Sequence, residues 1–379
     1  MRNFFYRYSV VLLFTLCSLF RPVLGQTEGV LPVIAGNTDN NTYLQPFHET
    51  EHAILFYNCE NLFDFSDDPL TQDDEFTPQG SRHWTSYRQY EKLVGLAKVI
   101  VDAGEGKPIS IIGLAEVEND SVLHRLVKGT ALWRWEYSYV ITRCDDVRGV
   151  NVALLYQPTD FRLLGWEALK IPLPKGSRPT RDLLHAWGRV VGGDTLDVVV
   201  CHLPSRLGGT RFSAPKRSAA HRTIRQLCDS LDQLRLHPHV LVMGDMNDSP
   251  DTRLLRRNMQ FGNGLYNLMD SLQSDLFRLK RSIGTHKYQG QWSILDQFWV
   301  NQGLLPEGKT IRNQPQQADS FSSCRLWVDS VRIISYPYLL VEDYTHLGHR
   351  PKRSYYGYQY EGGFSDHLPI RLNLHIRYR

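Results

Sequence analysis

Two segments far apart in the chain place polar side chains with metal-binding atoms beside apolar runs. Asp245 and Asn247 follow one such run, and Asp366 with His367 precedes another. Carboxylate and amide oxygens suit a hard divalent cation, and an imidazole beside them can hold or donate a proton near neutral pH. This chemistry is what hydrolysis of a phosphoester requires: a cation, a group that orients water, and an acid for the leaving oxygen.

Further polar groups stand in equivalent places, each at the end of an apolar run of strand length or inside one. In an α/β fold, groups at equivalent strand ends converge on one crevice, where ligands bind. These side chains are therefore expected to meet in space. They are Asn58 and Glu60 after run 53–57, Glu116, Glu118 and Asn119 after 111–114, His202 after 198–201, and Asp296 within 293–299.

Each group alone also has an ordinary structural explanation. A glutamate after a strand often lies beside a helix N-cap, Gly-Asp-x-Asn is often a turn, and a lone histidine is often structural. The order and strand-end placement of the whole set favour a site. Its oxygen ligands predict Mg²⁺ or Mn²⁺ as cofactor, and the shortage of His and Cys clusters disfavours zinc.

The elements that must position these groups alternate between short apolar runs and amphipathic segments. This alternation predicts an α/β fold, with some antiparallel pairing because runs 137–141 and 151–156 lie close together. Further strands are expected at 53–57, 109–114, 196–201, 240–243, 295–300 and 368–374. One helix is expected to open with the capping box Ser86-x-x-Gln89, and a second begins near Pro215.

The composition is that of a soluble globular protein with a sizeable core. The 379 residues are 42% hydrophobic and 22% charged, with a net charge of +3. Since the chain is nearly neutral, affinity for a polyanion must be local. No repeat and no linker divides the chain, so one domain is expected over residues 51–379. No stable protein partner is implied.

The first 25 residues carry a basic start, an apolar run and small residues before Gln26. This pattern predicts a signal peptide at 1–25 and a secreted or periplasmic protein, with an uncleaved anchor as the alternative. No transmembrane segment is expected after its removal. Bulky Leu16 disfavours lipidation at Cys17. Residues 26–50 are polar and aperiodic, which predicts an extended lead-in.

The sparse, odd set of cysteines after the leader is not a disulfide framework. Cys59 and Cys201 lie in strand-like runs and are expected to be buried thiols, while one disulfide elsewhere stays open. The acidic stretch between Asp67 and Glu75 is expected to be a solvated loop. The tyrosine-rich segment 355–360 is expected to form a strand.

Seven strings, in order between about residues 51 and 376, resemble the endonuclease/exonuclease/phosphatase superfamily with the deoxyribonuclease I-like fold. Additional strings at 202–209, 284–288 and 362–364 resemble a secreted bacterial subgroup. The seven strings are Asn58-Cys59-Glu60-Asn61-Leu62-Phe63, Ile112-Gly113-Leu114-Ala115-Glu116-Val117-Glu118, Val152-Ala153-Leu154-Leu155-Tyr156, His202-Leu203-Pro204-Ser205-Arg206, Gly244-Asp245-Met246-Asn247-Asp248, Leu295-Asp296-Gln297 and Ser365-Asp366-His367.

The resemblance implies a four-layer α/β sandwich, in which two packed mixed β-sheets are flanked by helices and the site lies at one edge. It also implies roles for individual residues. Asn58, Glu116 and Asp366 would be metal ligands, Asp245 and Asn247 would orient water and contact the phosphate, His367 would be held by Asp296, and His202 would be the second histidine. The sequence offers no obvious carboxylate partner for His202.

Two arginines are candidates for contact with the substrate phosphate. Arg206 lies just after His202, and Arg148 lies before the run 151–156. The other basic residues after His202 are expected on the solvated face of the following helix. They are Arg211, Lys216, Arg217, Arg222 and Arg225.

These observations predict a Mg²⁺-dependent phosphoester hydrolase, with a phosphodiesterase or nuclease acting on DNA or RNA as the first candidate. A phosphatase, or a phosphodiesterase acting on phospholipids or sugar phosphates, is the alternative on the same scaffold. A non-catalytic binding module is the alternative of another class. The natural substrate, endo or exo cleavage, the number of metal ions and the oligomeric state stay open from the sequence.

Overall fold

The structure is a computed structural model that describes residues 46–206, 209–260, 264–270, 272, 283–307 and 324–379. The predicted signal peptide at 1–25 and most of the predicted lead-in lie outside these residues. Within the described part of the lead-in, the first strand already begins at His48. Among the described residues, no helix combines the length and the apolar character needed to cross a membrane.

The first sheet has the strand order β13-β18-β1-β2-β4-β3. β1 pairs in parallel with β2, and the other neighbours are antiparallel. The sheet is therefore mixed, as predicted. Its strands are β1 (His48–Leu62), β2 (Ile111–Val117), β3 (Ser138–Ile141), β4 (Asn151–Tyr156), β13 (Cys324–Ile333) and β18 (Ile370–Tyr378).

The second sheet has the order β5-β6-β7-β8-β12-β9 and repeats this plan. Its central strands β7 and β8 are parallel, and their neighbours are antiparallel. The hairpin formed by β5 and β6 was not predicted. The strands are β5 (Phe161–Leu169), β6 (Leu183–Val190), β7 (Thr195–His202), β8 (Val240–Asp245), β9 (Tyr266–Asn267) and β12 (Asp296–Val300).

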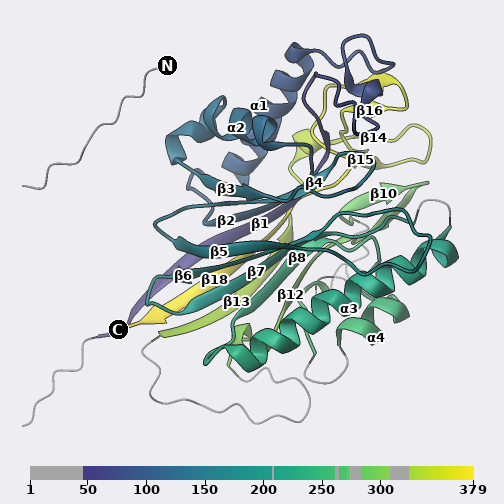
Figure 1. Cartoon of the computed structure of the whole chain (residues 1–379). Helices are drawn as coiled ribbons and strands as arrows, with labels where there is room; N and C mark the ends of the chain where they lie inside the picture. The colour runs from purple at the N-terminus through teal and green to yellow at the C-terminus, as the bar shows by residue number, and fades with distance from the viewer. Residues whose placement is uncertain (1–45, 207–208, 261–263, 271, 273–282, 308–323) are drawn as a thin grey trace, which may run out of the picture. The chain divides into compact units, whose positions relative to one another are not determined.

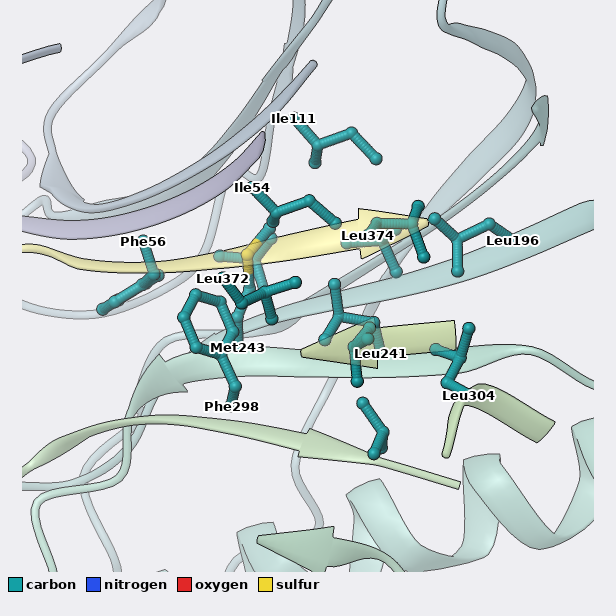
Figure 2. Close-up of a cluster of buried hydrophobic side chains, with 14 of the residues drawn as sticks. Ile54, Phe56, Ile111, Leu196, Leu241, Met243, Phe298, Leu304, Leu372 and Leu374 are labelled. Carbon is teal, nitrogen blue, oxygen red and sulfur yellow. The ribbon is translucent and has the colours of Figure 1, made fainter. Parts of the chain in front are cut away.

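The two sheets pack face to face around one apolar core. Side chains from both sheets, such as Ile54 and Leu372 from the first and Met243 and Phe298 from the second, point into the same layer (Figure 2). These residues are fully buried, as alternating inward-facing positions of two packed sheets must be. The packing explains why the central strands read as nearly continuous apolar runs.

Helices cover the outer face of each sheet, which completes the four-layer sandwich (Figure 1). The helices α1 (Ser86–Ala103) and α2 (Asp120–Lys128) pack on the first sheet. The helices α3 (Thr210–Leu234) and α4 (Arg253–Met259) pack on the second. The predicted fold class is confirmed.

Short elements join the layers and carry the loops above the sheets. Among the described residues, three two-stranded ribbons lie in the C-terminal third of the chain. The tyrosine-rich segment 355–360 was predicted to be one strand, but the chain turns at Gly357, with φ of 61°, and forms the two short strands of one ribbon. The ribbons are β10 (His286–Tyr288) with β11 (Gln291–Ser293), β14 (Leu340–Glu342) with β15 (His349–Pro351), and β16 (Tyr355–Tyr356) with β17 (Gln359–Tyr360). The 3-10 turns are η1 (Asp74–Phe76), η2 (Ala131–Trp135), η3 (Gln302–Leu304) and η4 (Pro337–Leu339).

Several local predictions need correction. The N-cap of α1 is Thr85, whose hydroxyl accepts the Arg88 N–H, so Ser86 is inside the helix. α3 begins at Thr210, and Pro215 is accommodated inside it. In the acidic stretch, Asp73 is buried and accepts the Asp68 N–H. Cys59 and Cys201 are buried free thiols, as expected.

Arg217 is buried, so its predicted place on a solvated helix face is wrong. Its Nε donates to Asp248 Oδ2 at 2.8 Å, and its Nη1 donates to Ser213 Oγ at 2.8 Å. The ion pair thus ties α3 to the loop after β8. Because both partners are fully buried, removal of one leaves an uncompensated charge in the interior.

We expect Arg217→Met to lower the free energy of unfolding by about 3–5 kcal/mol, since Asp248 would lose a buried partner. Urea denaturation followed by circular dichroism measures the change. Arg222→Met, on an exposed position of the same helix, is the matched control and should change stability by less than about 0.5 kcal/mol. Equal effects of the two substitutions would contradict a structural role for the pair.

Candidate active site

The second sheet brings three predicted residues together at one edge. β7 and β8 are parallel and in register, so His202 lies beside Asp245 at the carboxyl ends of both strands. β12 runs antiparallel to β8 and begins there, which places Asp296 opposite Asp245. His202 Nε2 lies 3.6 Å from Asp245 Oδ2. All three side chains are almost completely buried.

The first sheet contributes Asn58 and Glu116 from its parallel pair. Asn58 on β1 is in register with Ala115 on β2, so Glu116 follows directly beside it. Asn58 Nδ2 donates to Asp245 Oδ2 at 3.2 Å, and this bond joins the two sheets. Glu116 Oε1 lies 3.8 Å from His202 Nε2. His202 therefore has two neighbouring carboxylates, which the sequence alone did not reveal.

The segment before β18 adds Asp366 and His367. Ser365 Oγ donates to the Asn58 carbonyl at 2.7 Å and accepts the His367 N–H at 3.0 Å, which fixes the segment to β1. His367 Nδ1 lies 2.7 Å from Asp296 Oδ2, and its Nε2 lies 3.8 Å from Asp245 Oδ2. The predicted pairing of His367 with Asp296 is present in the structure.

The β10 strand supports this pair in a way that the sequence did not predict. Thr285 Oγ1 accepts the Asp296 N–H at 3.1 Å, and its carbonyl accepts the Leu368 N–H at 2.7 Å. The next residue, His286, pairs with His367 in an isolated β-bridge, with ring centroids 4.7 Å apart. The string 284–288 is part of the family resemblance, but nothing in the sequence indicated what Thr285 or His286 does.

Four residues at this edge adopt the left-handed backbone region that side chains disfavour. They are Glu60, Asn61, Glu116 and Asn247, with φ of 50°, 51°, 60° and 50°. Such strain persists only where surrounding contacts enforce it, and it concentrates at functional sites. Here the Asn61 N–H donates to Glu116 Oε2 at 2.8 Å, and the Asn247 N–H donates to Asp245 Oδ1 at 2.8 Å. The strained backbone thus holds both carboxylates in place.

Arg148, predicted to contact the substrate phosphate, lies beside Glu116 and Asn61. Its Nη2 donates to Glu116 Oε2 at 3.1 Å and to Asn61 Oδ1 at 2.7 Å. Burial alone would raise the pKa of Glu116, but Arg148 and His202 hold that pKa well below its usual range. Glu116 is therefore ionised at neutral pH, which suits a carboxylate ligand of a divalent cation.

The surroundings of the remaining titratable groups shift their pKa values in different directions. Burial raises the pKa of Asp245 to about 7, against the opposing effect of His367. Burial also opposes the charged form of His367, but Asp296 and Asp245 raise the pKa of this imidazole well above 6.5. Burial and Arg181 lower the pKa of His202 well below 6.5. One imidazole is thus cationic and the other neutral.

A second ionic network holds Asp366 from the side of the β15–β16 loop. Arg353 Nη2 donates to Asp366 Oδ2 at 2.9 Å, and its Nε donates to Glu60 Oε1 at 3.0 Å. Lys92 of α1 is buried and lies 3.8 Å from Glu60 Oε2. Burial would raise the pKa of Asp366, and Arg353 lowers that pKa. Sequence reasoning missed Lys92 and Arg353, because neither follows a strand.

Three predicted residues are held differently from the rest. Asn247 donates its side-chain amide to the Leu203 carbonyl at 2.9 Å. Arg206 donates to the Asn247 carbonyl and to Asp248, so it braces the loop after β8. Glu118 turns away and accepts the Asp64 N–H, and burial raises its pKa to about 8. Of these, Asn247 and Arg206 still border the site.

The donor set fits a hard divalent cation. Glu116 Oε2 is engaged by Arg148 and Asn61, whereas Oε1 faces His202. Asp245, Asp296 and His367 each offer a ligand atom within 4.8 Å of the others, and so do His286, Asp366 and His367. Among the described residues, Asp296 Oδ1 is buried without a hydrogen-bond partner. Carboxylate oxygens without committed donors are what Mg²⁺ or Mn²⁺ requires.

A family model described as the endonuclease/exonuclease/phosphatase family matches residues 53–376. The chain belongs to this family. The match covers every residue of the site described above, from Asn58 to His367. The family includes phosphoester hydrolases, in agreement with the chemistry of these side chains. No curated protein matches the chain significantly.

Solved structures with low sequence identity share the fold. A humanised zebrafish (D. rerio) TDP2 is 14% identical with a TM-score of 0.52, covering 86% of this chain and 98% of that one. A Bacteroides thetaiotaomicron mannosyl-6-phosphatase is 12% identical with a TM-score of 0.52, covering 85% and 99%. The human nocturnin catalytic domain with bound sulfate is 14% identical with a TM-score of 0.50, covering 87% and 96%.

We expect Glu116→Gln to weaken Mg²⁺ or Mn²⁺ affinity by about 100-fold or more, because it removes an ionised carboxylate from the donor set. Isothermal titration calorimetry with each metal checks this. Glu118→Gln, directly after the same strand β2, is the matched control. Burial raises the pKa of Glu118 to about 8, so glutamine resembles the neutral carboxyl group present at pH 7. Unchanged metal affinity in Glu116→Gln would contradict the assignment.

We expect Asp296→Asn to lower kcat by about 10²–10⁴-fold, since His367 would lose its orienting partner. The raised pKa of His367 means that the imidazolium persists above pH 6.5. Loss of the carboxylate lowers this pKa, so the alkaline limb of the pH–activity profile should move to lower pH. Asp329→Asn, which removes the carboxylate 3.2 Å from His375, should leave the profile in place.

Proposed function

We propose that this protein hydrolyses phosphoesters with the help of a divalent cation. The observation that carries the proposal is the meeting of groups from both sheets. His202 Nε2 lies 3.8 Å from Glu116 Oε1 and 3.6 Å from Asp245 Oδ2, Asn58 donates to Asp245, and His367 lies beside Asp245. Family membership supports phosphoester hydrolysis. The donor set supports the cation, which would neutralise charge on the phosphorus oxygens.

The protein side chains divide the remaining work. Asp245, which the Asn58 amide and the Asn247 N–H hold in place, is positioned to accept a proton from the attacking water. His367, held cationic by Asp296, stabilises charge that develops on the phosphate. His202 is neutral and donates a hydrogen bond to a phosphate or leaving-group oxygen. Arg148, whose side chain is 41% exposed, contacts another phosphate oxygen.

DNA or RNA is the first candidate substrate, as the sequence indicated. One similar structure, a D. rerio TDP2 with a TM-score of 0.51, is described as complexed with a single-stranded DNA product. A sugar phosphate is the second candidate, and two observations favour it. One similar structure is a mannosyl-6-phosphatase. Arg206, Arg217 and Arg225 are engaged by Asp248 and Asp229, so they offer little free charge to a polynucleotide backbone.

Turnover of bis(p-nitrophenyl) phosphate should be abolished by EDTA and restored by Mg²⁺ or Mn²⁺, because the anionic donor set needs a cation to bind phosphate. The purified wild-type protein and the His367→Ala variant are assayed in parallel. The rate measured with the variant is the background rate. Turnover that survives chelation would contradict metal dependence. Absence of turnover on any phosphoester would favour the binding module.

To identify the natural substrate class, the protein is assayed with single-stranded DNA, RNA, hexose 6-phosphate and phospholipid vesicles. Each assay contains the cation that restores turnover of the aryl diester. We expect cleavage of the nucleic acids or of the sugar phosphate, measured as oligonucleotide products or released phosphate. Preferential hydrolysis of the phospholipid would contradict both candidates. The same panel distinguishes endo from exo cleavage by product length.

A further inference from the structure

A polar cavity lies beside the site and takes no part in the chemistry proposed above. Its volume is about 170 Å³, far more than the roughly 15 Å³ that one water requires. Its lining residues come from the end of β1, the loop between β1 and α1, and the β15–β17 segment. Figure 1 shows these segments above the first sheet. Its walls include Glu60, Asn61, Arg82, Arg353, Tyr355 and Gly357.

Two of the walls are shared with the candidate active site. Asn61 donates its backbone N–H to Glu116 and accepts Arg148 at its side-chain oxygen. Arg353 donates to Asp366 from the other side. A ligand in the cavity therefore lies next to the groups that hold the cation and the scissile phosphate. The cavity is therefore linked to the candidate active site through Asn61 and Arg353.

Arg82 lines the cavity, and several contacts fix its guanidinium. Nε donates to Glu75 Oε2 at 3.0 Å, and Nη1 donates to the Gly357 carbonyl at 2.6 Å. Its guanidinium carbon lies 5.3 Å from the centroid of Phe76 and 5.0 Å from that of Tyr355. A cation stacked between rings and held by two acceptors is preorganised to bind a ligand.

The hydrogen-bond inventory of the cavity leaves donors in excess. Both oxygens of Glu60 are already engaged, by Arg353 and by the Ser354 N–H. Among the described residues, no partner is present for Arg82 Nη2, Arg353 Nη1 or Asn61 Nδ2. A ligand that satisfies these groups must bring acceptors. Arg82 is paired with Glu75, and Arg353 with Glu60 and Asp366, so the cavity offers N–H donors and not unpaired charge. The guanidinium forks of Arg82 and Arg353 match a planar or tetrahedral anion better than neutral hydroxyls.

We propose that this cavity binds a second phosphate group of the substrate, next to the phosphate that is hydrolysed. The inference rests on the proposed function and narrows its substrate class to molecules that carry two phosphates in proximity. That chemistry has two sources: the adjacent phosphate of a nucleic-acid strand, or the second phosphate of a small molecule such as a sugar bisphosphate. Arg82 is then a residue that determines specificity and is not a catalytic residue.

The test compares kcat/KM for two pairs of substrates that differ by one phosphate. One pair is a hexose bisphosphate and its monophosphate, and the other is a dinucleotide with and without a terminal 5′-phosphate. We expect wild-type protein to prefer the doubly phosphorylated member of one pair by at least tenfold, mainly through KM. The pair that shows the preference identifies the source.

Arg82→Gln should reduce this preference at least tenfold, and Arg82→Lys should restore part of it, because lysine keeps the charge but not the fork. Arg134→Gln, an exposed arginine stacked on Trp133 outside the cavity, is the matched control. Inhibition of bis(p-nitrophenyl) phosphate turnover by pyrophosphate gives a second measurement, and Arg82→Gln should weaken it at least tenfold. Thermal melts confirm that each variant is folded.

Three outcomes are distinguishable. Wild-type protein that hydrolyses the aryl diester, yet shows no preference in either pair and equal pyrophosphate inhibition in Arg82→Gln, overturns the phosphate pocket alone. Wild-type protein that hydrolyses no phosphoester overturns the proposed function and the pocket with it. A preference that Arg134→Gln reduces as much as Arg82→Gln also overturns the pocket, since general charge would then explain it.

Discussion

The structure depends on burying many ionisable groups at one edge between two sheets without leaving any of them uncompensated. An isolated buried carboxylate is expensive, so each must find a cation, a hydrogen-bond donor or a proton. Asp245 meets this constraint with the Asn58 amide and with a pKa raised to about 7. Glu116 meets it with Arg148, and Asp366 with Arg353. The same compensation that permits burial gives each group a distinct protonation state.

The architecture supplies the positions that this compensation requires. Each sheet has one parallel pair at its centre, β1 with β2 and β7 with β8, and the carboxyl ends of both pairs reach the same edge. The left-handed residues Glu60, Asn61 and Glu116 stand where β1 and β2 end and their register shifts. The strain there is offset by hydrogen bonds that the flat interior of a sheet does not offer. Regular strands position the site, and their irregular ends shape it.

Sequence reasoning reached the site because strand-end polar groups leave a local signal. Asn58, Glu116, His202, Asp245, Asp296 and His367 each stand beside an apolar run, and all are brought together. Lys92 and Arg353 left no such signal, since their partner Glu60 is 32 residues from one in sequence and 293 from the other. Arg217 was placed on the solvated face because it is charged, although it lies seven residues, or two helical turns, before the buried Ile224. Its charge could not show that Asp248, from a distant loop, would pair with it in the interior.

A separate small core above the first sheet fixes the cavity. Phe63, Phe76, Trp84, Val150 and Tyr355 pack together there, apart from the core between the sheets. Trp84 Nε1 donates to the Phe63 carbonyl, and the Tyr355 hydroxyl donates to the Arg82 carbonyl. The groups of the candidate active site are therefore held by the sandwich, while Arg82 is held by loops with their own packing.

Because the sheets hold the candidate active site and the loops hold Arg82, substitutions in these two parts of the molecule have different effects. Substitutions in the central sheets disturb several compensated charges at once, because Asn58 and Asp245 link both sheets through one hydrogen bond. Substitutions around Arg82 disturb a local core. Among the cavity walls, Asn61 and Arg353 contact the candidate metal-ligand carboxylates Glu116 and Asp366, so these two residues connect the local core to the candidate active site. Substrate preference can therefore vary with the loops, while the reaction stays fixed by the sheets.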